Sequence, residues 1–114
     1  MSQSAAVATD YFATRWDAEE RRVKARFHEL VISFPSLAQD AAGVLPFNAD
    51  RFDKWARGPS PGSGALAAAR FVLSVWNPQT KWKCGAFNLH EALCCWDGAH
   101  SEAFAAWVAD PFWP

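Results

Sequence analysis

The run ALAAARFVLSVW, residues 65–76, is apolar almost all round and is interrupted only by Arg70 and Ser74. A helix without a polar face has to be covered on every side, so this run predicts the central helix of a helical bundle. The pair Asn77-Pro78 ends it, because the residue before a proline avoids the α region. The glycine, proline and serine run GPSPGSG, residues 58–64, precedes it and predicts a loop between helices, with Ser60 or Ser63 as the cap of the central helix.

The length of 114 residues predicts one domain spanning residues 1–114, because a second core would have too few residues. We therefore expect an all-α fold, a single-domain bundle of four to five helices around the central apolar helix. An α+β fold is the alternative, because RFVLSVW and KWKCGAF are rich in strand-forming residues and NPQT between them suits a turn. This alternative places a hairpin at residues 70–87.

A long amphipathic helix is predicted from Asp10 to Phe34, ended by Pro35. Its apolar residues recur on one face, and Asp17 and Glu20 each precede a basic residue by four positions on the solvated face. A short helical turn is expected within residues 37–42, followed by a short helix from an Asp50 cap to Gly58. The apolar face of the long helix comprises Phe12, Trp16, Val23, Phe27, Leu30 and Phe34.

Another helix is predicted after Asn88, which forms a capping-box-like pair with Glu91. Apolar residues keep the helical spacing across the pair Asp97-Gly98, so the segment is either one kinked helix or two collinear ones. The residues predicted to lie in the core from this stripe are Leu93, Trp96, Phe104 and Trp107.

All three cysteines and two of the three histidines fall in the run CGAFNLHEALCCWDGAH, residues 84–100. Zinc is one interpretation, with Cys84, His90, Cys94 and His100 as ligands, because His90 and Cys94 share a helix face. We expect instead no metal and no cofactor, since no C-x2-C motif is present and His100 falls on the apolar stripe. Cys94 and Cys95 are then small packing residues, with His90 and Glu91 on the solvent side.

An enzyme is not expected. A Cys-His-Asp trio can be drawn from Cys84 or Cys94 with His100 and Asp97, but no known nucleophile signature surrounds any cysteine. We therefore name no catalytic residue.

The formal net charge of −1 hides an uneven distribution, because residues 51–83 are basic and residues 84–114 carry no Lys or Arg. The two parts either face each other in the fold or leave a basic patch for an anionic partner. We expect the lone Arg70 to pair with Glu91 or Asp97, since an unpaired buried charge is costly. A nucleic-acid site is the second hypothesis, with lysines flanking an exposed tryptophan in KWK, and its candidates are Arg51, Lys54, Arg57, Lys81 and Lys83.

The chain holds seven tryptophans, and tryptophan gathers at interfaces as well as in cores. We therefore expect a small intracellular, non-enzymatic interaction or adaptor protein that binds a protein partner or a second copy of itself through an aromatic surface. The candidate interaction residues are Trp55, Trp82, Phe112 and Trp113, and the last two either fold back onto the bundle or remain anchors for a partner. No run is long and apolar enough to span a bilayer, and the start MSQSAAVATD has no signal-peptide pattern, so we expect a cytoplasmic, bacterial protein without a membrane partner.

Overall fold

The computed structural model describes the backbone of residues 2–114 and the side chains of residues 15–114. Its elements are all helical: α1 Ser2–Ser33, α2 Pro35–Asp40, the 3-10 helix η1 Ala42–Val44, α3 Ala49–Arg57, α4 Ser63–Trp76, α5 Leu89–Cys95 and α6 Gly98–Ala109. The all-α prediction is confirmed. The hairpin alternative is wrong, because residues 70–76 continue α4 and residues 77–88 form a loop in which no strand occurs within the described backbone.

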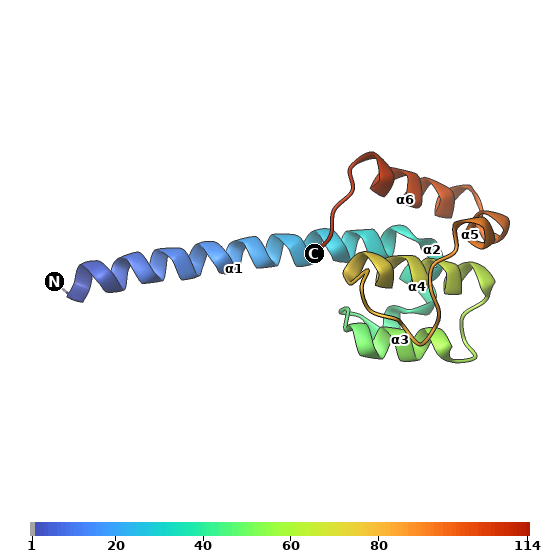
Figure 1. Ribbon diagram of the computed structural model, residues 1–114, viewed down its shortest axis with the longest axis horizontal. Coiled ribbons are helices and arrows are strands. Elements are labelled where there is room, and N and C mark those ends of the chain that lie inside the picture. The colour runs from blue at the N-terminus through green and yellow to red at the C-terminus, as the bar shows by residue number, and fades with distance from the viewer. Residues whose placement is uncertain (1) are drawn as a thin grey trace.

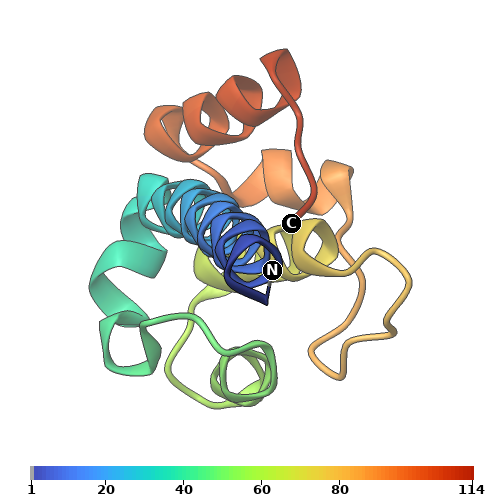
Figure 2. The same ribbon diagram turned by 90° about the vertical axis from the view of Figure 1, so that its left-hand side faces the viewer.

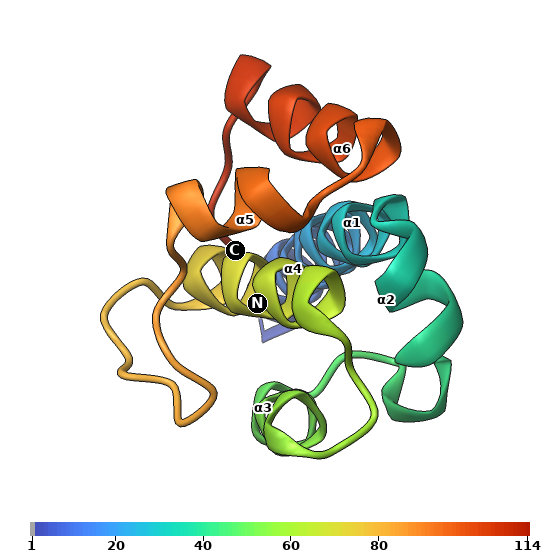
Figure 3. The same ribbon diagram turned by 90° about the vertical axis from the view of Figure 1, so that its right-hand side faces the viewer.

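The helix α4 lies in the centre, as its apolar run predicts. The C-terminal half of α1 lies beside it, α3 covers one side, and α5 and α6 cover the other (Figures 1 and 3). Alanines let the neighbouring helices approach closely, while Phe71, Val72 and Leu73 fill the space further along α4. The buried residues of α4 are Ala65, Ala67, Ala68, Ala69, Phe71, Val72, Leu73 and Val75.

The first helix is longer than predicted and extends beyond the bundle. Its last turns bury Phe27, Leu30 and Val31 in the core. Residues 15–22 are all exposed, and the N-terminal half runs away from the other helices (Figures 1 and 2). The expectation that Trp16 joins the buried face is therefore wrong, because this tryptophan lies where nothing covers α1 and is 74% exposed. The side chain of Phe12, assigned to the same face, lies outside the described residues.

Side-chain caps begin three of the helices, α3, α5 and α6. Asn48, two residues before the expected Asp50, caps α3 by accepting from the Arg51 amide, and Gly58 ends that helix as predicted. The prediction that Ser60 or Ser63 caps α4 is wrong, because Gly62 occupies the N-cap position and no side chain caps the helix.

The segment after Asn88 is two helices rather than one. Asn88 accepts from the Glu91 amide at the start of α5, as predicted. Asp97 then caps α6 by accepting from the His100 amide. This break turns Leu93 outward, so Leu93 is 53% exposed and its core prediction is wrong. Trp96 is buried, and Phe104 and Trp107 pack against the core while half-buried.

Candidate functional site: an exposed helix face and a basic hollow

The cysteines and histidines of residues 84–100 do not converge. Cys84 is buried in the loop, whereas Cys94 and Cys95 are exposed on α5, so their predicted packing role is wrong because only Ala92 of that short helix is buried. His90 and Glu91 are exposed, as predicted. The sulfur of Cys94 lies 4.0 Å from His90 Nε2. Among the side chains of residues 15–114, no three His, Cys, Asp or Glu are grouped to hold a metal ion.

Cys84 belongs to a junction that fixes the loop to α3. The buried Asp53 carboxylate accepts from the Cys84 amide at 2.9 Å and from the Lys83 amide at 3.2 Å. Burial, reinforced by a hydrogen bond to the carboxylate and its negative charge, raises the pKa of the Cys84 thiol to about 12. A raised thiol pKa leaves little thiolate for nucleophilic attack, and the hydrogen bonds of Lys83 and Cys84 to Asp53 hold this part of the loop against α3.

A chain of hydrogen bonds that sequence reasoning missed joins Ser36, His100 and Asp97. The Ser36 hydroxyl lies 2.7 Å from His100 Nε2, and His100 Nδ1 lies 2.7 Å from an Asp97 carboxylate oxygen. The Ser36 amide also donates to Nε2, at 3.4 Å, so Nε2 accepts and the ring proton is on Nδ1. The order of groups is that of a serine nucleophile activated by histidine.

The surroundings of these hydrogen bonds favour a structural role for Ser36, His100 and Asp97. His100 is buried, with its ring 6.0 Å from that of Phe34 and 6.4 Å from that of Trp96. The Ser36 amide also donates to the imidazole, which fixes this residue against His100 through its backbone as well as its hydroxyl. These hydrogen bonds therefore connect α2 to α6. Hydrogen bonds from the His100 amide and imidazole hold the pKa of the Asp97 carboxyl below its usual range.

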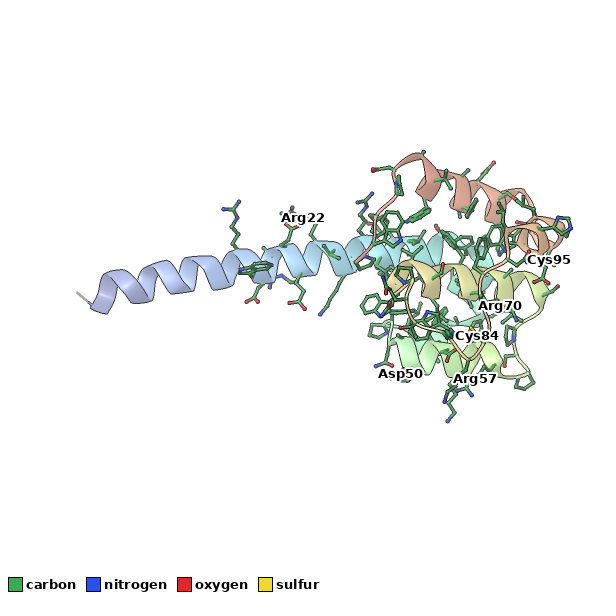
Figure 4. The ribbon with its side chains drawn as sticks, viewed as in Figure 1. Arg22, Asp50, Arg57, Arg70, Cys84 and Cys95 are labelled. Carbon is green, nitrogen blue, oxygen red and sulfur yellow. The ribbon has the colours of Figure 1, made fainter. Side chains whose placement is uncertain are left out.

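Arg70 is fixed between α4 and the loop that follows it. Its Nε donates to the Cys84 carbonyl at 2.7 Å, and Figure 4 draws these two residues close together. The predicted partner Glu91 is found, but at 3.8 Å from Nη1, which is an ion pair without a hydrogen bond. Gly85 has φ +103°, and a Cβ there would come within 3.0 Å of Nε and Nη2, so only glycine lets the loop lie against the guanidinium.

A hollow of about 690 Å³ opens beside Arg70. Lys81, Trp82 and Phe87 contribute to its wall. The Trp82 indole N–H donates to the Leu73 carbonyl at 3.0 Å, and the ring is half-buried. Trp82 thus differs from the exposed tryptophan that the nucleic-acid hypothesis assumed, and serves as a wall of the hollow.

The remaining basic candidates lie on or near α3. Arg51, Lys54 and the half-buried Trp55 line a second hollow, of about 430 Å³. The Nε of Arg57 lies 4.0 Å from the Asp53 carboxylate. Within the described side chains, Arg51, Lys54, Lys81 and Lys83 have no carboxylate within ion-pair distance, and the pair of Arg70 with Glu91 is the one that links the basic and acidic parts of the chain.

The C-terminal aromatics divide between the two predicted roles. Phe112 folds back, with the Arg26 guanidinium 3.9 Å from its ring centroid and its carbonyl accepting from the Trp107 indole at 3.1 Å. Arg26 also pairs with the Asp110 carboxylate at 3.0 Å, which fixes the tail to α1. Trp113 packs edge-on against Trp107 but is 59% exposed. Trp113 therefore remains available at the surface, where Trp16 is the other strongly exposed tryptophan of the described residues.

Comparisons with family models, with curated proteins and with solved structures give no match for this chain. No helix within the described backbone has a stretch long and apolar enough to cross a membrane.

Proposed function

We propose that this chain is a small, non-enzymatic interaction protein that acts inside the cell, and that it pairs with a second copy through the projecting half of α1. The observation that carries the proposal is Trp16. It lies on the helix face that buries Phe27 and Leu30 further along α1, but it is 74% exposed because that face continues beyond the bundle.

The length of the projecting part supports a helix partner. Residues 2–22 rise about 30 Å at 1.5 Å per residue, which is between five and six turns. Most helix stability in proteins comes from packing of the apolar face, and residues 15–22 of α1 are all exposed. A second helix along the Trp16 face would supply that packing.

The charges on this part of α1 favour a second copy as the partner. Residues 15–24 carry four basic and three acidic side chains, so two such surfaces can meet without strong net repulsion. Two of the acidic residues are already neutralised along the helix, by the pairs of Arg22 with Glu19 at 2.9 Å and of Lys24 with Glu20 at 3.2 Å. A strongly charged partner would find no complementary surface here.

The proposed intracellular location rests on Cys94 and Cys95. Both thiols are free and exposed on α5, a state that persists in a reducing compartment.

Light scattering after size-exclusion chromatography tests the proposal with two matched variants. Trp16→Glu places a charge on the proposed face, and Ala18→Glu places the same charge on an exposed position about 160° further round the helix at 100° per residue. The wild type and Ala18→Glu should elute as dimers and Trp16→Glu as a monomer. A monomeric wild type at high concentration, or dimers of all three proteins, would show that α1 is not a self-association surface.

A further inference from the structure

The hollow beside Arg70 has the composition of a ligand site. It lies on a part of the molecule separate from the projecting half of α1. Its volume of about 690 Å³ falls within the range of small-molecule pockets. Its polar groups converge from α4 and the following loop, and its apolar walls are aromatic. The side chains that line it include Arg70, Ser74, Lys81, Trp82 and Phe87, and among the described residues of the lining none is Asp or Glu.

Arg70 has donors to spare at this hollow. A guanidinium offers five N–H donors, and here one is used by the Cys84 carbonyl at 2.7 Å. Glu91 lies 3.8 Å away, is 64% exposed and makes no hydrogen bond to it. The Arg70 side chain is only 26% exposed, so its charge is partly removed from water, and its ion pair with Glu91 leaves its remaining N–H donors without a hydrogen-bond acceptor among the described residues. An anion in the hollow would supply the missing acceptors.

The walls of the hollow are held in place before any ligand binds. The Trp82 ring is fixed by its hydrogen bond to Leu73, and the loop between Trp82 and Phe87 is fixed to α3 by the two amide hydrogen bonds to Asp53. The Gly85 backbone lies against the guanidinium. Phe87 packs edge-on against the buried Phe71, with ring centroids 5.2 Å apart. A site of this kind loses little entropy when it is occupied.

We propose that this hollow binds a small anion with a flat aromatic body, an aryl phosphate or an aromatic carboxylate. The anionic group accepts from Arg70 and lies near the Lys81 ammonium. The aromatic body lies between the Trp82 and Phe87 side chains, which offer apolar surface at the size of one or two rings.

The test is a titration followed in the ¹H–¹⁵N spectrum through the Arg70 Nε–H, the Trp82 indole N–H and the Gly85 amide. The probes are phenyl phosphate and benzoate, with inorganic phosphate, acetate and benzyl alcohol as partial ligands. Phenyl phosphate or benzoate should shift these three signals saturably. Each partial ligand should have an affinity at least about tenfold lower, because it lacks either the charge or the ring. The stronger of the two aryl anions identifies the ligand class.

Three variants locate the binding. Arg70→Gln should weaken it about tenfold or more through loss of the charge-assisted hydrogen bonds. Glu91→Gln should leave binding equal or stronger, because it removes the carboxylate that competes for the guanidinium. Lys54→Gln on α3, outside this hollow, should change nothing.

If neither aryl anion shifts these signals saturably at concentrations up to about 10 mM, at which a site with a Kd of about 1 mM would be roughly nine-tenths occupied, the proposal is overturned. Equal binding by Arg70→Gln would overturn it as well. If Arg70→Gln fails to fold, Lys81→Gln replaces it. This exposed lysine lies in the loop, so its substitution preserves the fold and should weaken binding several-fold, and unchanged binding would count against the site.

Discussion

Trp96, which follows the last residue of α5, is buried among aromatic rings, and replacing it by alanine should destabilise the core. Trp96 is 8% exposed, and its ring lies 5.4 Å from that of Phe34, 5.9 Å from that of Phe87 and 5.7 Å from that of Phe104. Its indole N–H also donates to the Gly64 carbonyl at 3.1 Å. The substitution leaves a cavity among three aromatic rings and removes a hydrogen bond between the residue after α5 and the start of α4.

The cost follows from these contacts. Truncation of a buried tryptophan destabilises a protein by about 3 to 5 kcal/mol. A domain of this size has a total stability of about 5 to 15 kcal/mol, so the variant loses a large part of it. At roughly 3 to 6 °C per kcal/mol, the melting temperature should fall by about 9 to 30 °C. Trp96→Phe keeps a ring and loses the Gly64 hydrogen bond, so it should cost less.

Circular dichroism during urea and thermal unfolding measures this effect, with Leu93→Ala as the matched control. Leu93 and Trp96 share a stripe in the sequence, but Leu93 is 53% exposed, so its truncation should cost less than about 1 kcal/mol. Equal losses of stability for the two variants would refute the division of this segment into α5 and α6.

Three other outcomes follow from the structure. In the native protein a thiol reagent should label two cysteines rapidly and Cys84 only after unfolding, since burial raises its pKa to about 12, and mass spectrometry of the labelled peptides measures the order. The pKa of Asp97 is lowered in the folded state, so its carboxylate stabilises the fold at neutral pH, and this contribution is lost as the pH falls through the folded pKa. Asp97→Asn should therefore be less stable than the wild type at pH 7. Urea unfolding at several pH values should show this difference in stability vanish in acid. Ending the chain at Asp110 removes the stacking of Arg26 on Phe112 and the hydrogen bond from the Trp107 indole to the Phe112 carbonyl, so the melting temperature should fall by a few degrees. An unchanged thermal transition would mean that the tail does not stabilise the bundle.

The sequence is sufficient to predict the helices but not where the core beneath them ends. The periodicity of α1 places Trp16 on the same face as Phe27, eleven residues or about 16 Å along the helix, and it carries no information on whether α4 reaches that far. The core prediction for Leu93 failed for a related reason, because the spacing continues in phase through Asp97 although Trp96 and Asp97 are extended and a new helix begins after them.

Contacts between distant segments were beyond the reach of sequence patterns. Ser36 lies 64 residues from His100, and no local motif links them. The carboxylate of Asp53 holds the loop at Lys83 and Cys84 from 30 and 31 residues away. Arg70 was recognisable as a lone charge on an apolar helix, but the hollow beside it depends on the fold of residues 77–88.

Hydrogen exchange of the α1 backbone amides tests the central claim most directly, because it reports on the projecting helix itself. If residues 2–22 pair with a second copy, their amides should exchange slowly in concentrated protein and rapidly after dilution, and rapidly at both concentrations in Trp16→Glu, whereas residues 27–33 should remain protected throughout. Exchange of residues 2–22 that is equally fast at every concentration, in a protein whose other helices are protected, would contradict the pairing of α1.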